Sequence, residues 1–221
     1  MTTDAGVEME IDELQMDALR ELGNVGASHA STALTELVKT DIVIDVTECR
    51  VLPMDSLPNR LGELGEQLTT VKIDIGDSGS CIYMIFPEKI AIYLSDLLLG
   101  HPHDPSRPMT EEDKEVMVEM GDICIRRYLV PLSKFLSIDL IPNSPSVSMD
   151  KLEDRLKFPE VLRHLHDHNV VRIETNFVDT NQRFQGAIIF APDASTQQLT
   201  FKRFGVDAES QMATFSKFGL Q

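Results

Sequence analysis

Three polar residues, Asp17, Glu21 and Asn24, have the types and spacing that could do chemistry. At i, i+4 and i+7 they align as one stripe along a helix. An Asn carboxamide both donates a hydrogen bond to water and accepts one from it, so it could orient water for attack. Phosphoryl-group hydrolysis depends mainly on such positioning and on electrostatics. The alternative is a solvated helix face without function, because Glu-x-x-Asn alone is a common spacing.

The helix that must carry this stripe is expected over about Asp12 to Lys39. Asp12 and Gln15 form a capping pair at its start. Beside the polar stripe, apolar residues recur at three- and four-residue steps, which is typical of an amphipathic helix: Ile11, Leu14, Ala18, Leu22, Val25, Ala33 and Leu37.

Two glycines, Gly23 and Gly26, flank Asn24 inside this predicted helix. Each costs up to ~1 kcal/mol of helix stability relative to Ala. A glycine lets another backbone or surface approach closely. We therefore expect Gly23, Gly26 and Asp17 to contact a partner.

A second helical segment repeats the arrangement 98 residues later. The matching pairs are Asp12 with Thr110, Asp17 with Glu115, Glu21 with Glu119, Gly23 with Gly121, and Asn24 with Asp122. A second register of 105 residues relates Pro87 to Pro192 and Gly100 to Gly205. A duplication with one loop insertion gives this pattern. We predict one domain over residues 1–221, with pseudo-twofold-related internal repeats at about 10–105 and 108–221.

The remaining segments predict an α/β fold of the α+β type, in which the repeats share a mainly antiparallel sheet. The β-type runs span 41–46, 69–75, 80–86, 146–149, 170–178 and 186–190. Helices are expected over 88–99 and between Pro192 and Gly205. The two motif helices should lie side by side on one surface.

Three further segments carry expectations that the structure can test. His101–Pro108 contains three prolines and is the best candidate linker. Pro131 removes a hydrogen bond from its helix at a cost of ~3 kcal/mol, so that helix should end near Val130 or kink there. Asp150–His168 is expected to form one or two short helices.

Composition excludes several classes of protein. The 20 basic and 36 acidic residues give a net charge of −16, which argues against nucleic-acid and anionic-membrane partners. No apolar run is long enough for membrane insertion, and the acidic N-terminus lacks the pattern of a secretion signal. The cysteines at 49, 81 and 124 suggest neither a disulfide framework nor a zinc cluster. We expect a cytoplasmic protein.

Histidines offer a weak metal hypothesis. His164, His166 and His168 alternate, but only two could share a helix face and no carboxylate-rich motif accompanies them. His101 and His103 lie in the proline-rich segment and are expected to be solvated. No GxxxxGK loop is present, which disfavours ATP or GTP binding. We predict no metal site.

The run from Glu21 to Val38, ELGNVGASHASTALTELV, closely resembles the signature helix of the CheC/CheX/FliY family. Members of this family are chemotaxis phosphatases that dephosphorylate the response regulator CheY. The resemblance is greatest to CheC, which carries two active-site helices in one chain. It implies that Asn24 orients the attacking water and that Glu21 pairs with a receiver lysine. Magnesium would belong to the receiver, so the protein would need no cofactor of its own, and the deamidase CheD is implied as a second partner.

The sequence departs from the family pattern at two positions. Thr47 stands where the first motif has Pro, whereas Pro145 is in register in the second. In the second motif Glu115 and Glu119 are acidic as expected, but Asp122 replaces Asn. An ionised carboxylate donates no hydrogen bond and repels a phosphoryl group by about 1–4 kcal/mol at ~4 Å. Glu119 and Asp122 are thus expected to form a weak second catalytic site, with Glu115 contacting the partner.

Two specific functions remain open from the sequence, beside a third class, a generic acidic interaction module. The leading one is a hydrolase that removes the aspartyl phosphate of a CheY-like receiver in chemotaxis two-component signalling. The alternative is a non-catalytic adaptor that binds CheY, CheD or a switch of the motility motor, because proteins such as FliM share the fold. Intact Asp17, Glu21 and Asn24 favour catalysis; Thr47 and Asp122 favour the adaptor.

Overall fold

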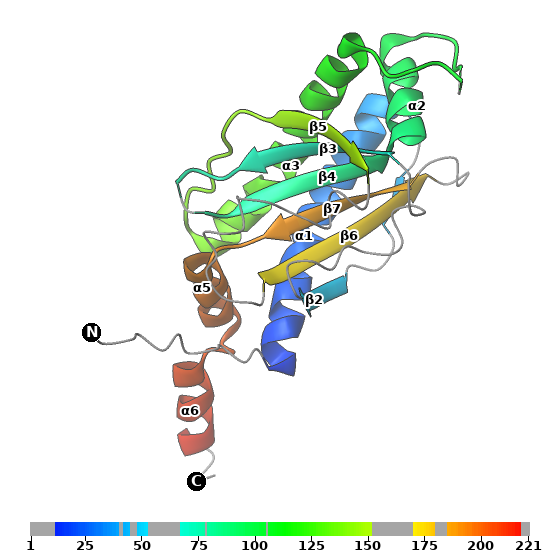
Figure 1. Cartoon of the computed structure of the whole chain (residues 1–221). Helices are drawn as coiled ribbons and strands as arrows, with labels where there is room; N and C mark the ends of the chain where they lie inside the picture. The colour runs from blue at the N-terminus through cyan, green and yellow to red at the C-terminus, as the bar shows by residue number, and fades with distance from the viewer. Residues whose placement is uncertain are drawn as a thin grey trace.

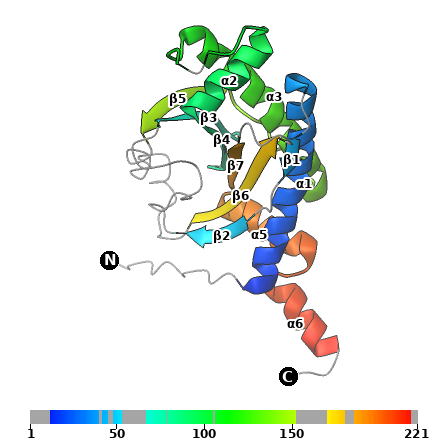
Figure 2. The ribbon, with the colours of Figure 1, turned by 90° about the vertical axis from the view of Figure 1, so that its right-hand side faces the viewer.

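A seven-stranded antiparallel sheet forms the centre of the structure, with two long helices across one of its faces (Figures 1 and 2). The computed structural model describes residues 12–39, 42–44, 48–52, 67–77, 79–104, 106–151, 170–179 and 185–217. Thr47 and the segment 152–169, with its three histidines, lie outside the described residues, so the expectations placed on them stay predictions.

The long helices α1 (Glu13–Val38) and α3 (Glu111–Leu136) begin with the same local device. In α1 the Gln15 N–H donates to Asp12 Oδ1 over 2.8 Å, and the Asp12 N–H donates to Gln15 Oε1 over 3.2 Å. Thr110 and Asp113 form the equivalent capping box of α3. Such reciprocal bonds satisfy backbone donors that have no partner within the helix. The capping pair expected at Asp12 is confirmed.

The sheet order is β5-β3-β4-β7-β6, with β1 and β2 both pairing with β6. The strand bounds are Ile42–Ile44 (β1), Glu48–Leu52 (β2), Gln67–Asp74 (β3), Cys81–Pro87 (β4), Ser146–Lys151 (β5), Val170–Asp179 (β6) and Gln185–Ala191 (β7). Every described pairing is antiparallel. The predicted α/β fold with a mainly antiparallel sheet is therefore confirmed, while β2 was not anticipated.

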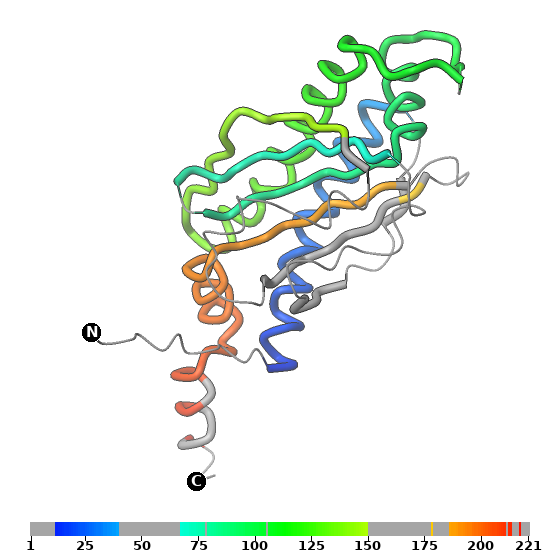
Figure 3. The backbone as a smooth tube through the Cα atoms, in the orientation of Figure 1, coloured from blue at the N-terminus to red at the C-terminus, as the bar shows by residue number. Residues whose placement is uncertain are grey.

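The order of elements agrees with the predicted duplication. Both ends of α1 and α3 differ by 98 residues, and each helix ends in a left-handed residue, Lys39 or Ser137. On the sheet, β5-β3-β4 mirrors β2-β6-β7 about the central pair, where Tyr83 faces Ile189 and Met84 faces Ile188. Figure 3 shows α1 and α3 running in opposite directions, as a twofold axis perpendicular to both helices would produce. The two-repeat origin stays a proposal.

The described residues form three further, shorter helices: α2 (Glu88–Leu99), α5 (Ala194–Phe204) and α6 (Ala208–Lys217). The first two end at Gly100 and Gly205, whose φ angles of 70° and 69° are readily adopted only by glycine. Helix α6, which extends away from the sheet (Figure 1), was not predicted. None of the described helices is long and apolar enough to span a bilayer.

Helix α3 continues through Pro131 to Leu136, so the first alternative, an end near Val130, is wrong, and the second, a kink at Pro131, stays a prediction. Tertiary packing outweighs the local cost of the proline, because Leu132 and Leu136 beyond it are fully buried.

The core lies between the helices and the sheet. It gathers Leu19, Leu22 and Leu34 of α1, Cys124, Ile125 and Tyr128 of α3, and Ile82, Met84, Ile188 and Phe190 of the central strands.

The proline-rich segment 101–108 is not a free linker, as an ion-pair network holds it against α2 and α3. Arg107 donates to Asp96 Oδ1 over 2.6 Å and to both carboxylate oxygens of Asp113 over 2.6 and 2.7 Å. Both carboxylates are 2% exposed. His103 Nδ1 lies 2.8 Å from Asp96 Oδ2, while the His103 side chain stays 37% exposed, so it contacts solvent as expected and also has a carboxylate partner. Buried carboxylates require such partners, which the sequence reading did not identify.

These contacts set the acidity of the two carboxyl groups. The hydrogen bonds from Arg107 hold the pKa of Asp113 well below its usual range, with help from Ser95 and Thr110 and in spite of burial. Burial acts to raise the pKa of Asp96, but bonds from His103 and Arg107 outweigh it and the pKa is lowered. Both groups therefore stay ionised inside the fold.

Candidate functional site

The first motif lies on the solvent-facing side of α1, as its spacing predicts. Asp17 and Glu21 are exposed and Asn24 is half-buried. Behind them the same helix buries a continuous face that includes Leu19, Leu22 and Ala27. The polar stripe thus stands on a helix held firmly from behind, which is what positioning chemistry requires.

The three polar side chains of α1 differ in how they are engaged. Asp17 Oδ1 accepts from Arg20 Nη1 over 2.5 Å, in an exposed pair of low energetic value. Within the described residues neither the Glu21 carboxylate nor the Asn24 carboxamide has a side-chain partner. Glu21 and Asn24 are consequently free to bind groups of another molecule, whereas Asp17 must first release Arg20.

Gly26 allows a close contact within the chain, with Tyr128 of α3. A Cβ at position 26 would lie 2.7 Å from the Tyr128 ring. Tyr128 is fully buried and also packs edge-on against Phe190, with ring centroids 6.0 Å apart. Gly23 is buried as well. The close approach expected from a partner at Gly26 is therefore made by this chain's own Tyr128, and it fixes α1 on α3.

The second motif, on α3, has the same spacing as the first, but its side chains have different partners. Glu115 and Glu119 are exposed, and Asp122 is partly buried. Asp122 Oδ2 accepts from Arg126 Nε over 2.7 Å, while Asp122 Oδ1 is buried and has no hydrogen-bond partner in the part of the chain that the structure describes. Gly121 lies against β3, where a Cβ would meet Val71 at 2.6 Å. The second motif is thus engaged within its own helix.

The ion pair between Arg126 and Asp122 was not anticipated from the sequence. The signal was present, because an Asp and an Arg four residues apart on a helix commonly pair. In α1 the corresponding residue, 98 positions earlier, is Ser28, which cannot neutralise a neighbour. The two motifs therefore differ at two positions, Asn24 against Asp122 and Ser28 against Arg126.

Metal-ligating and thiol groups contribute nothing to this site in the described residues. No group of three or more His, Cys, Asp or Glu side chains there could hold a metal ion. Cys81 and Cys124 are buried, and burial raises the pKa of the Cys124 thiol to about 12. Buried thiols of this kind are chemically inert.

Comparisons with known proteins agree with this geometry. Residues 14–47, which contain the first motif, match the model of the CheC-like family. The chain is 25% identical over 205 residues to the CheY-P phosphatase CheC of Bacillus subtilis (strain 168), covering 88% of this chain and 96% of that protein. The resemblance to CheC predicted from the sequence is confirmed.

Solved structures extend the likeness to the whole fold. Thermotoga maritima FliY gives a TM-score of 0.67 at 15% identity, covering 89% of this chain and 98% of that one. A chain of the FliG–FliM complex from H. pylori gives 0.57 at 11% identity, covering 85% and 98%. At such identities these matches establish the fold alone.

Proposed function

We propose that this CheC-like protein is a phosphatase that removes the aspartyl phosphate from a CheY-like receiver domain. One observation carries the proposal: exposed Glu21 and half-buried Asn24 lie about one turn apart on a helix whose opposite face is packed against the core. The named activity of the Bacillus subtilis relative supports the same reaction class.

In the proposed reaction α1 enters the receiver's active cleft. The Asn24 carboxamide accepts a hydrogen bond from the attacking water and donates one to it, which fixes the water in line with the phosphorus. A new bond forms between the water oxygen and phosphorus while the bond to the aspartyl oxygen breaks. The products are inorganic phosphate and the receiver's free carboxylate.

Glu21 has a separate proposed role. Its exposed carboxylate pairs with a lysine of the receiver and thereby fixes α1 relative to the phosphoryl group. Magnesium is supplied by the receiver, so that this chain contributes positioning and no cofactor. The packing of Gly26 against Tyr128 supports the proposal because it makes the motif helix rigid.

Two other proposed elements follow from the resemblance to CheC. We propose Asp17 and Glu115 as further contacts at the receiver interface, and CheD as a second partner, whereas Gly23, also expected at that interface, is buried in the fold. Glu119 and Asp122 form the weaker second site in this scheme, since Arg126 occupies the carboxylate of Asp122.

The competing function is a non-catalytic adaptor. It is favoured by the engaged state of the second motif and by the likeness to FliM, a protein solved in complex with FliG. The adaptor would bind its partners through the same helices without hydrolysing anything.

Phosphate release separates the two functions. A CheY-like receiver charged with acetyl phosphate would be mixed with this protein, with its Asn24→Ala variant, or with buffer. The phosphatase proposal expects faster release with the unaltered protein only. Unchanged release together with measurable binding to the receiver would favour the adaptor.

A further inference from the structure

The C-terminal half of α3 and the end of α5 carry positive charge in a strongly acidic chain. From Ile123 to Leu136 there is no Asp or Glu, but there are Arg126, Arg127 and Lys134. Helix α5 likewise lacks acidic residues and ends in Lys202 and Arg203. With a net charge of −16 overall, this concentration of cations is a distinct electrostatic feature.

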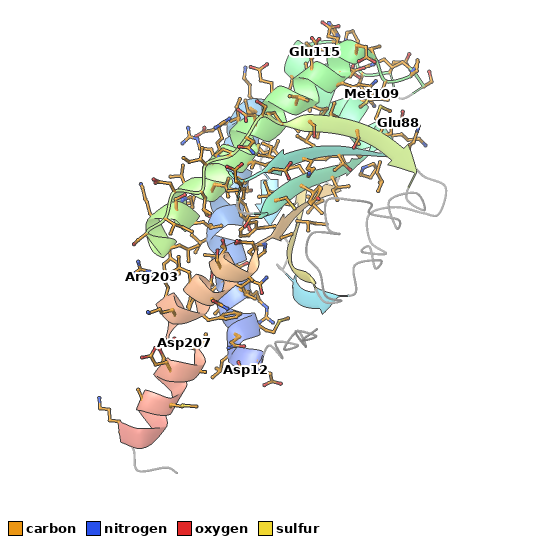
Figure 4. All side chains as sticks on the ribbon, turned by 60° about the vertical axis from the view of Figure 1, so that its left-hand side comes forward. Asp12, Glu88, Met109, Glu115, Arg203 and Asp207 are labelled. Atoms are coloured by element: carbon orange, nitrogen blue, oxygen red, sulfur yellow. The ribbon has the colours of Figure 1, made fainter. Side chains whose placement is uncertain are left out.

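The tertiary structure brings these two helix ends together. Arg203 Nη2 donates to the carbonyl oxygen of Leu136 over 3.2 Å. The Phe135 and Phe204 rings are 4.9 Å apart, yet the two residues remain 40% and 36% exposed. Figure 4 shows Arg203 at the far end of α3 from Glu115. An apolar centre thus lies beside basic side chains, away from the second motif.

Two more exposed cations of α3 lie to one side of this apolar pair. At 100° per residue, Arg127 and Lys134 fall within about 20° of each other and about 80–100° from Phe135, whereas Arg126, which is paired with Asp122, is about 180° from Phe135. Arg127 and Lys134 are exposed. Within the described residues, Arg127, Lys134 and Arg203 have no carboxylate partner. We define the basic–apolar surface as Arg127, Lys134, Phe135, Arg203 and Phe204.

We propose that the basic–apolar surface binds an acidic amphipathic helix of a partner protein. Aromatic and Arg side chains are enriched in binding interfaces, where apolar anchors supply most of the energy. Arg127 and Lys134 are two helical turns apart, about 10 Å, which matches a partner helix with carboxylates at a similar spacing. Apolar residues at three- and four-residue steps on that helix would cover Phe135 and Phe204.

Charge complementarity favours an acidic helix over a second copy of the chain or a bilayer as the binding partner. A second copy of the chain would bring its own net charge of −16 and be repelled overall. A bilayer of anionic lipid would have to approach the same negative molecule. A short acidic helix carries far less charge and can be confined to the basic–apolar surface. The proposed binding at this surface does not depend on the phosphatase proposal.

The test uses a fluorescein-labelled 18-residue helical peptide with Leu on one face and Glu beside it. Fluorescence anisotropy measures its binding to the full chain in 50 mM salt. We expect saturable binding that weakens at least tenfold in Arg127→Glu/Lys134→Glu and at least fivefold in Phe135→Ser/Phe204→Ser. Lys89→Glu/Lys217→Glu makes the same change in charge elsewhere and should weaken binding less than twofold. Thermal unfolding verifies that each variant is folded.

Several outcomes would overturn the proposal. One is no binding of the peptide, and another is equal binding to the unaltered chain and Arg127→Glu/Lys134→Glu. A peptide with Lys in place of Glu that binds as tightly would remove the charge argument. If phosphatidylglycerol vesicles bind through these residues and the peptide does not, the surface faces a membrane. Self-association in sedimentation velocity that disappears in Arg127→Glu/Lys134→Glu, without peptide binding, would assign the surface to a second copy.

Discussion

Arg126 Nε lies 2.7 Å from Asp122 Oδ2, one helical turn away on α3. This ion pair occupies the position where α1 has a free carboxamide at Asn24 and a small hydroxyl at Ser28. The second motif is thus altered both by losing a donor and by gaining a cation that holds its carboxylate.

The ion pair leads to a prediction about restoring the second site. Asp122→Asn in an Asn24→Ala background supplies the donor, but Arg126 can still donate to the new amide oxygen and cover it. We expect little recovery of receiver dephosphorylation from that double variant. Adding Arg126→Ser recreates the α1 pattern and should recover at least tenfold more activity, measured by phosphate release. Equal activity of the two variants would show that the ion pair does not limit the site.

The first motif should separate turnover from binding. Removing one group that positions the reacting water costs about 10²–10³ in rate, so Asn24→Ala should lower kcat by that factor with little change in receiver affinity. Glu21→Ala should mainly weaken receiver binding. Glu119→Ala and Asp122→Ala are the matched changes on α3 and should alter turnover much less. Stopped-flow phosphate release and a binding titration provide both quantities; a dead Glu119→Ala enzyme would reverse the ranking of the helices.

Gly26 should be intolerant of even a methyl group. Ala is ~1 kcal/mol better than Gly in a helix, but a Cβ 2.7 Å from the buried Tyr128 ring forces the two helices to move apart. Overpacking of this kind costs ~1–3 kcal/mol. Gly26→Ala should therefore lower the free energy of urea unfolding.

Two controls make the Gly26 prediction specific. Ser28→Ala, on the exposed side of the same helix, should change stability little. In Tyr128→Leu the clash is relieved, so adding Gly26→Ala there should cost less than in the unaltered chain. A full cost in both backgrounds would mean that the Tyr128 contact is not the cause.

Arg107 should stabilise the fold in a pH-dependent way. Arg107→Gln leaves the buried carboxylates of Asp96 and Asp113 without their cation, which typically costs ~3–5 kcal/mol at pH 7. Because their pKa values are lowered in the folded chain, their stabilisation is fully present above the unfolded pKa of about 3.9 and is lost as pH falls through the folded values.

The pH dependence of the variant has the opposite sign. Without Arg107 the buried carboxyls take up protons more readily. Lowering the pH should therefore raise the free energy of unfolding of the variant and lower that of the unaltered chain. Urea unfolding at pH 7 and pH 4 should show a smaller difference between the two proteins at pH 4. An exposed pair offers the matched control, since Arg20→Gln, which removes the partner of Asp17, should cost less than about 1 kcal/mol at either pH.

Local patterns in the sequence determined the elements that carry the motif. The capping pair at Asp12 and the three- and four-residue apolar steps specify α1, since both act within a few residues along the chain. The same rules placed the motif stripe on the solvent side and located Gly100 as the end of α2. Strand β2 and helix α6 were missed because short segments carry a weak periodic signal.

Only the tertiary structure decided which distant groups meet. Asp96 and Asp113 are 17 residues apart in the sequence, with Arg107 between them, and Phe135 and Phe204 are 69 residues apart. Folding places each set within contact distance, where burial makes ion pairing obligatory for the carboxylates. Gly26 is a further example. The sequence indicated that another group comes close to it, but the packing of α3 on α1 determines which group that is. Helix periodicity is a local property of the chain, whereas side-chain partners are set by the packing of elements that lie far apart in the sequence.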